Sequence, residues 1–127
     1  MTSDRILAES RNYRVISSFE TVSLVFCSNG RKIDIGDFYG EPQGAFIDKN
    51  ERFVAMYGCG LILYFLHEPF DEYCYDFPSP QWFEAGRNEP IMWVDNAVQT
   101  DDDNLRLTLE NGDAVNICFS DKLPKIF

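Results

Sequence analysis

Apolar and polar residues alternate most clearly near the C-terminal end of the chain. Leucines occupy positions 105, 107 and 109, polar residues lie between them, an Asn-Gly pair follows at 111–112, and residues 114–119 are again largely apolar. Alternation places leucines on one face of a strand, and Asn-Gly suits a type I′ turn because both residues tolerate a positive φ. The pattern predicts an antiparallel hairpin. Residues 21–28 and 31–35 flank Asn29-Gly30 and predict a second one.

The other elements follow from runs rich in Val, Ile, Phe and Tyr. Residues 45–47 and 53–57 predict a third hairpin, and 13–19 and 91–100 predict further strands. The run LILYFL at 61–66 is continuously apolar, which is typical of a central strand covered on both faces. Residues 67–90 hold four of the six prolines and are predicted to be mostly irregular. A short helix is expected over residues 3–12, capped by Ser3 and Asp4.

Successive hairpins without a long helical crossover favour an antiparallel architecture. We therefore expect one mainly β domain over residues 1–127. Its form would be a sandwich or barrel-like sheet of about seven or eight strands with a short N-terminal helix. A chain of 127 residues can bury enough apolar surface to fold without metals or disulfides.

Charge then narrows the class of partner. The formal net charge is −10 and the pI is about 4.4. A field of this sign repels nucleic acid and anionic membranes and attracts basic proteins. The first residues lack the apolar stretch of a signal peptide, and the four cysteines are scattered. We expect a cytoplasmic protein with four reduced thiols, bound neither to nucleic acid directly nor to membranes.

Catalytic and metal sites find little support in the residue pattern. His67 is the one histidine, and Cys59 and Cys74 are the thiols closest to it, but no nucleophile motif surrounds them. The acidic residues near His67 lack the paired spacing of zinc ligands, and residues 101–104 lack the frame of a calcium loop. We expect no enzyme activity, no cofactor and no metal. An enzyme that uses His67 with a nearby thiol or carboxylate is the least favoured alternative.

A stretch without basic residues is the most informative feature. Between Arg52 and Arg87 there are 34 consecutive residues without Lys or Arg. The same 34 residues include five acidic residues and ten of the nineteen aromatic residues. Carboxylates can take the place of phosphates in a basic cleft, and neighbouring aromatic rings supply buried contact area. The predicted protein-binding residues are Glu68, Phe70, Asp71, Glu72, Tyr73, Tyr75, Asp76, Trp82 and Glu84.

Two further acidic groups would extend this face if the fold brings them alongside it. One consists of Asp37, Tyr39 and Glu41, and the other of Asp95 with residues 101–103. Two alternatives stay open. The rings could point inward from an edge strand while the acids are solvated. The rings of Tyr64, Tyr73 and Trp82 could instead line a pocket of a small-ligand or regulatory module.

The run GDFYGEPQGAFIDKNERFVAMYGCGLILYFLHEPF at residues 36–70, within a small acidic β-rich chain, resembles a known class of proteins. It is similar to the immunity proteins of bacterial contact-dependent growth inhibition and other polymorphic toxin systems. The resemblance implies that the chain binds and neutralises one cognate toxin domain, often a basic nuclease. Such proteins share no binding motif, so the resemblance assigns no site residues.

Overall fold

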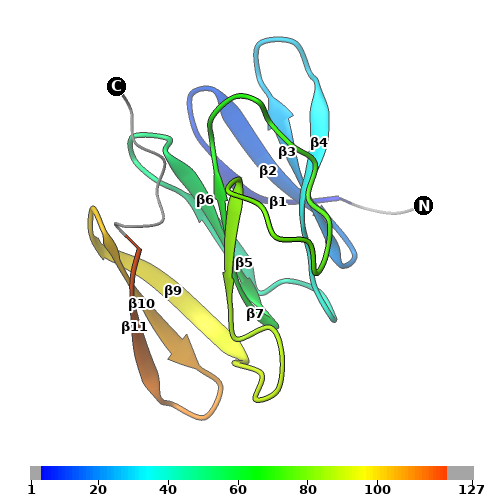
Figure 1. Cartoon of the computed structure of the whole chain (residues 1–127). Helices are drawn as coiled ribbons and strands as arrows, with labels where there is room; N and C mark the ends of the chain where they lie inside the picture. The colour runs from blue at the N-terminus through cyan, green and yellow to red at the C-terminus, as the bar shows by residue number, and fades with distance from the viewer. Residues whose placement is uncertain (1–3, 120–127) are drawn as a thin grey trace.

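Residues 4–119 are described by a computed structural model, in which this part of the chain forms eleven strands and no helix. The strands make three antiparallel sheets (Figure 1). The first sheet has the order β1 (Arg5–Glu9), β2 (Tyr13–Ser18), β3 (Thr21–Phe26) and β4 (Lys32–Asp37). The middle sheet has the order β5 (Gly44–Ile47), β6 (Phe53–Gly58), β7 (Gly60–Phe65) and β8 (Trp82–Ala85). The third sheet has the order β11 (Ala114–Cys118), β10 (Asn104–Leu109) and β9 (Val94–Asp101).

The middle sheet is covered on both faces, and every residue of β7 is buried. Ile62 and Tyr64 point into a core shared with the first sheet. Leu61, Leu63 and Phe65 point into a second core shared with the third sheet. The interpretation of residues 61–66 as a strand buried on both sides is therefore confirmed. Two cores separated by one sheet make the architecture three-layered.

The predicted N-terminal helix is wrong. Residues 5–9 form β1, which pairs with β2 and contains a β-bulge between Ile6 and Ala8. Leu7 and Ala8 pack partly against the first core, so pairing and burial together outweigh the weak local preference for a helix. Asp4 therefore caps no helix, and the proposed cap at Ser3 lies outside the described residues.

The three predicted hairpins are confirmed, although the two Asn-Gly turns differ in type from the expectation. β3 pairs with β4, β5 pairs with β6, and β10 pairs with β11. Gly30 and Gly112 have φ of +75° and +93°, but the preceding asparagines do not enter this region. The side chain of Asn29 instead accepts a hydrogen bond from the backbone N–H of Arg31, and Asn111 does the same for Asp113. These Asx-type bonds hold the asparagines in the ordinary backbone region.

The segment between β7 and β8 is irregular, as predicted. Hydrogen bonds attach it both to the first sheet and to the middle sheet. The N–H of Tyr73 donates to the Asp34 carbonyl at 2.9 Å, and the Tyr64 hydroxyl donates to the Asp71 carbonyl at 2.6 Å. The buried Gln81 amide donates to the Phe65 carbonyl at 2.6 Å. β8, which was not predicted, follows this segment and forms one edge of the middle sheet.

Two simpler expectations can also be compared with the structure. Cys27, Cys59, Cys74 and Cys118 all lie within residues 4–119 and form no disulfide with one another. Within the same residues there is no helix of the length and apolar character that crossing a membrane requires.

Candidate protein-binding face

Three adjoining cavities lie around Tyr75, at the end of the molecule where β4 leads to β5 and β8 leads to β9. Their volumes are about 270, 310 and 360 Å³, and neighbouring cavities share lining residues. We call the surface that they form the Tyr75 face. Its charged and aromatic members are Glu20, Asp37, Phe38, Tyr39, Tyr75, Asp76, Phe77, Trp82, Phe83, Glu84 and Arg87.

Arg87 holds the elements of this face together. Its Nη1 donates to the Cys59 carbonyl at 2.8 Å, and its Nη2 donates to the Asp37 carbonyl at the end of β4. Its Nε lies 3.1 Å from Glu84 Oε1, and its guanidinium lies 4.7 Å from the centre of the Phe38 ring. The Arg87 side chain is only 8% exposed. One buried cation thus connects the first sheet, the β6–β7 turn and β8.

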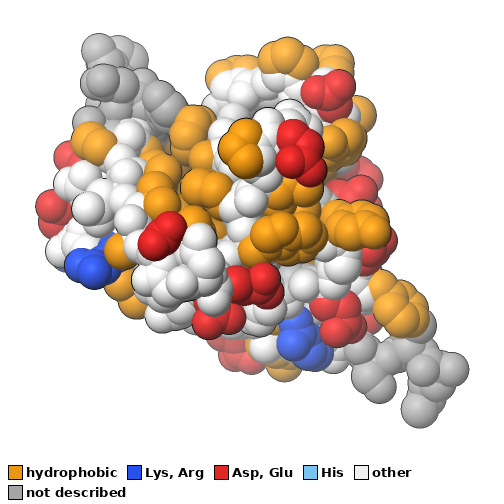
Figure 2. Space-filling model, turned by 90° about the horizontal axis from the view of Figure 1, so that it is seen from below, with side chains coloured by type: hydrophobic (Ala, Val, Ile, Leu, Met, Phe, Trp, Pro, Cys, Tyr) orange, Lys and Arg blue, Asp and Glu red, His pale blue; other side chains and the backbone are white. Residues whose placement is uncertain are grey.

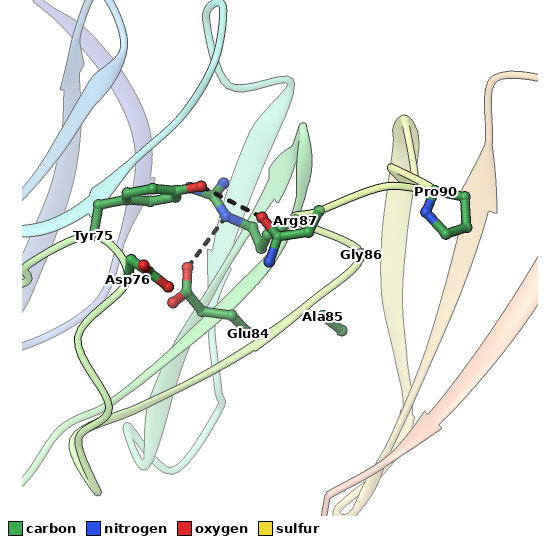
Figure 3. A pocket seen from close by; sticks show the side chains of 8 residues that line it. Tyr75, Asp76, Glu84, Ala85, Gly86, Arg87 and Pro90 are labelled. Carbon is green, nitrogen blue, oxygen red and sulfur yellow. Dashed lines mark hydrogen bonds and ion pairs between the residues drawn. The ribbon is translucent and has the colours of Figure 1, made fainter.

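Glu84 is fixed by one hydrogen bond and one ion pair on the same oxygen. The Tyr73 hydroxyl donates to Glu84 Oε1 at 2.6 Å, and Arg87 Nε forms an ion pair with that oxygen at 3.1 Å. Burial of Tyr73, followed by the nearby Glu84 carboxylate, raises the pKa of the Tyr73 hydroxyl well above its ordinary value. Tyr73 therefore remains a donor at neutral pH. Figure 3 shows Glu84 directed at Arg87, with Tyr75 and Asp76 around the same pocket.

The remaining carboxylates of the Tyr75 face are available to a partner. Asp37 and Asp76 are exposed, and within residues 4–119 neither side chain has a hydrogen-bonded or ion-paired partner. Glu20 uses one oxygen to accept the Gly40 N–H at 2.6 Å, which leaves its other oxygen uncommitted. Asp76 has a φ of +58°, a conformation that Asp tolerates better than most residues.

Large aromatic side chains are exposed among these carboxylates. Tyr39 is 78% exposed, and Tyr75 and Phe77 are more than half exposed. Phe19 adjoins Glu20 in the β2–β3 turn and is 65% exposed. Figure 2 views the molecule from this end, where hydrophobic side chains gather beside acidic ones and basic side chains are sparse. Exposed rings of this kind are typical of protein-binding surfaces.

Phe19 also adopts a strained backbone conformation, with a φ of +54°. The left-handed backbone region costs a bulky residue about 1–2 kcal/mol of conformational free energy, whereas Asn adopts it more easily. We expect Phe19→Asn to raise the free energy of unfolding by about 1 kcal/mol, measured by urea denaturation. Phe19→Ala is the control, because it removes the ring but keeps the strain. Equal stability of the two variants would show that the conformation of Phe19 imposes no strain.

The structure brings together some of the predicted binding residues and separates others. Tyr75, Asp76 and Glu84 line the same cavity. Tyr73 and Trp82 are buried in the first core, although Trp82 also borders one cavity, so neither ring projects as an anchor for a partner. Phe70 packs edge-on against Phe26, with ring centres 4.9 Å apart. The exposed residues Glu68, Asp71 and Glu72 line none of the three cavities.

Two residues of the first additional acidic group lie alongside the predicted segment. Asp37 and Tyr39 share a cavity with Tyr75, whereas Glu41 does not line it. Asp95 and residues 101–103 belong to β9 and the β9–β10 turn of the third sheet, where Asp102 pairs with Lys49. Sequence reasoning missed Glu20, Phe38 and Arg87. Arg87 had one visible signal, since it is the first basic residue after the long stretch without any.

The catalytic alternative receives no geometric support from His67. Its Nδ1 lies 3.2 Å from the Glu68 carbonyl, and its buried Nε2 has no hydrogen-bond partner. Neither ring nitrogen is therefore hydrogen-bonded to a thiol or a carboxylate. Within residues 4–119 no three His, Cys, Asp or Glu side chains are grouped so that they could hold a metal ion.

The rings of the predicted ligand pocket do meet, but as a packed cluster. Tyr64 stacks on Trp82 with ring centres 6.5 Å apart, and Tyr73 lies 5.0 Å from Trp82. Each of the three side chains is buried. These rings fill the first core instead of surrounding a space for a ligand.

No protein-family model, curated protein or solved structure matches the chain. The role of the Tyr75 face therefore has to follow from its own geometry and chemistry.

Proposed function

We propose that this chain is an immunity protein whose Tyr75 face binds and neutralises a basic, nuclease-type toxin domain. The observation that carries the proposal is the combination of available carboxylates with exposed rings on one face. Asp37, Asp76 and one oxygen of Glu20 are free to pair with basic groups. Tyr39, Tyr75 and Phe77 lie beside them and are largely exposed.

The two kinds of side chain would act at different stages of binding. A net charge of −10 accelerates the encounter with a basic domain and makes the association rate depend on salt. Once the surfaces meet, burial of exposed rings slows dissociation. Arg87 ties the backbone of several elements of the face together, so little backbone entropy is lost on binding.

A nuclease is the favoured kind of toxin because of charge complementarity. An enzyme that binds a phosphate backbone presents a basic cleft to solvent. A face with several carboxylates can occupy such a cleft in place of the nucleic acid. The resemblance of residues 36–70 to immunity proteins favours the same role. The proposed mechanism is direct obstruction of the substrate cleft.

The double variant Asp37→Asn/Asp76→Asn tests this proposal. We expect its association with the cognate toxin domain, which would be sought in the neighbouring upstream reading frame, to slow about tenfold at low salt. The difference should shrink at high salt because screening weakens long-range attraction. Association and dissociation rates would be measured by biolayer interferometry at 50 and 300 mM NaCl, together with protection of cells that produce the toxin.

Asp95→Asn/Glu110→Gln is the matched control. Like the double variant, it removes two negative charges, but from exposed positions in β9 of the third sheet and in the β10–β11 turn. If the control slowed association as much as the double variant, net charge alone would explain the effect, and the Tyr75 face would not be the interface.

A further inference from the structure

Two of the cavities share the Tyr75 and Arg87 side chains in their lining. The first, which we call the Tyr39 slot, is lined by Glu20, Asp37 and Tyr39 together with Tyr75 and Arg87. The second, the Asp76 slot, is lined by Asp76, Glu84 and Asn88 together with the same two residues. We propose that each slot receives one arginine side chain and that both arginines come from one segment of the partner. This inference rests on the proposed function.

Charge favours a cation in both slots. Together they contain four carboxylates and one guanidinium, which leaves a formal charge of −3. The Tyr39 slot holds the free carboxylate of Asp37 and an uncommitted oxygen of Glu20. The Asp76 slot holds the free carboxylate of Asp76, and the hydrogen bond from Tyr73 and the ion pair with Arg87 both engage Oε1 of Glu84. Each slot thus offers oxygen atoms that a guanidinium could pair with.

Arg87 does not repel such a ligand strongly, because its charge is already engaged. Glu84 neutralises it at Nε, and two backbone carbonyls accept from Nη1 and Nη2. The Arg87 side chain is largely buried and belongs to the lining of both slots. The charge that a ligand meets is therefore dominated by the exposed carboxylates.

The aromatic walls favour arginine over lysine. The ring of Tyr75 borders both slots, and Tyr39 provides a second exposed ring in one of them. A guanidinium is planar, stacks on aromatic rings and forms two parallel hydrogen bonds with a carboxylate, whereas an ammonium is compact and strongly hydrated. Arg87 itself shows this behaviour, since its guanidinium lies over the Phe38 ring.

The shared wall explains why one partner segment would supply both arginines. Because Tyr75 and Arg87 line both slots, the two ligands would be separated by little more than these two side chains. Residues that follow one another closely on a single strand or helix can present side chains at such a spacing. Two separate partner surfaces would compete for the same small area.

N-acetyl-arginine methylamide is a suitable probe because it tests the slots without any partner. We expect saturable shifts in the amide NMR signals of residues in both slots. Asp37→Asn should weaken binding about tenfold in the Tyr39 slot alone, and Asp76→Asn should do so in the Asp76 slot alone. Tyr75→Leu should weaken binding in both slots, because it removes the ring but keeps apolar bulk. Asn retains the backbone preference that Asp76 requires.

Three outcomes would overturn the inference. These are equal binding of neutral N-acetyl-glutamine methylamide, equal binding of N-acetyl-lysine methylamide, and unchanged arginine binding in both Asn variants. Failure of the inference can be distinguished from failure of the proposed function. Tight toxin binding without any binding of the arginine probe would refute the arginine-binding role of the slots and leave the proposed immunity role standing. Specific binding of the probe without any binding of the toxin domain would overturn the immunity role.

Discussion

Replacing Leu63 by Ala should lower the free energy of unfolding by about 3–4 kcal/mol, and replacing its neighbour Ile62 by Ala should lower it by about 3 kcal/mol. Leu63 is fully buried between the middle and third sheets. Ile62 is fully buried between the middle and first sheets. Each substitution leaves a cavity in a packed core, which adds to the lost transfer free energy of the deleted atoms.

Large effects at two adjacent positions are the specific signature of a three-layered arrangement. Successive side chains of a strand point to opposite faces. In a sheet with one solvated face, one of two neighbouring apolar residues would be exposed, and its truncation would change stability by less than about 0.5 kcal/mol. Because the two residues belong to different cores, their effects in the double variant should add nearly completely.

Urea denaturation, monitored by tryptophan fluorescence, measures the loss of stability in both alanine variants. Val98→Ala is the control, because Val98 lies on β9 and is 47% exposed. We expect that variant to differ from the parent by less than about 0.5 kcal/mol. If either Ile62→Ala or Leu63→Ala behaved like the control, one face of the middle sheet would be solvated and the three-layered fold would be wrong.

The parts of the fold that sequence predicted are those with a strong local signal. The run at 61–66 is too apolar to have a solvated face, and each Asn-Gly pair marks a chain reversal. β1 has no such signal, because the five residues RILAE suit a helix or a strand about equally well. Pairing with β2 decides between the two, and this pairing is a tertiary contact.

In the candidate site, too, local sequence predicts some features and tertiary contacts decide the others. The density of acidic and aromatic residues in 68–84 singled out Tyr75, Asp76 and Glu84, which line one cavity, but density does not reveal which rings are buried. The place of Arg87 depends on the carbonyls of Cys59 and Asp37, which lie 28 and 50 positions away in the chain. No spacing within the sequence predicts contacts of this range.

Replacing Asp48 by Asn should lower the free energy of unfolding by about 2–3 kcal/mol at neutral pH. The Asp48 side chain is fully buried, and its carboxylate accepts from Arg52 Nε at 2.7 Å and from Arg52 Nη2 at 3.1 Å. Gln99 of β9 donates to it at 3.0 Å, and Arg52 reaches the Asp102 carbonyl at 2.7 Å. The carboxylate therefore joins the β5–β6 turn of the middle sheet to the third sheet.

The size of this loss should depend on pH. Burial raises the pKa of the Asp48 carboxyl, but hydrogen bonds from Arg52 and Gln99 outweigh that effect and hold the pKa below its ordinary value. On acidification the unfolded chain therefore takes up this proton first, at about pH 4. The stabilisation is complete above that pH and disappears as the pH falls through the lower pKa of the folded state. The stability difference between parent and variant should be constant from pH 7 to about pH 5 and then narrow.

Urea titrations of the parent and Asp48→Asn at half-unit steps from pH 7 to pH 3 would measure this difference. Asp102→Asn is the matched control, because it removes a carboxylate from the neighbouring turn whose ion pair with Lys49 is exposed on both sides. An exposed pair of this kind contributes at most about 1 kcal/mol. A loss no larger than that of the control, or a stability difference that widens towards acid, would show that Asp48 does not connect the two sheets as a buried carboxylate. A loss of the expected size that narrows below about pH 5 would show that this buried carboxylate stabilises the attachment of the third sheet.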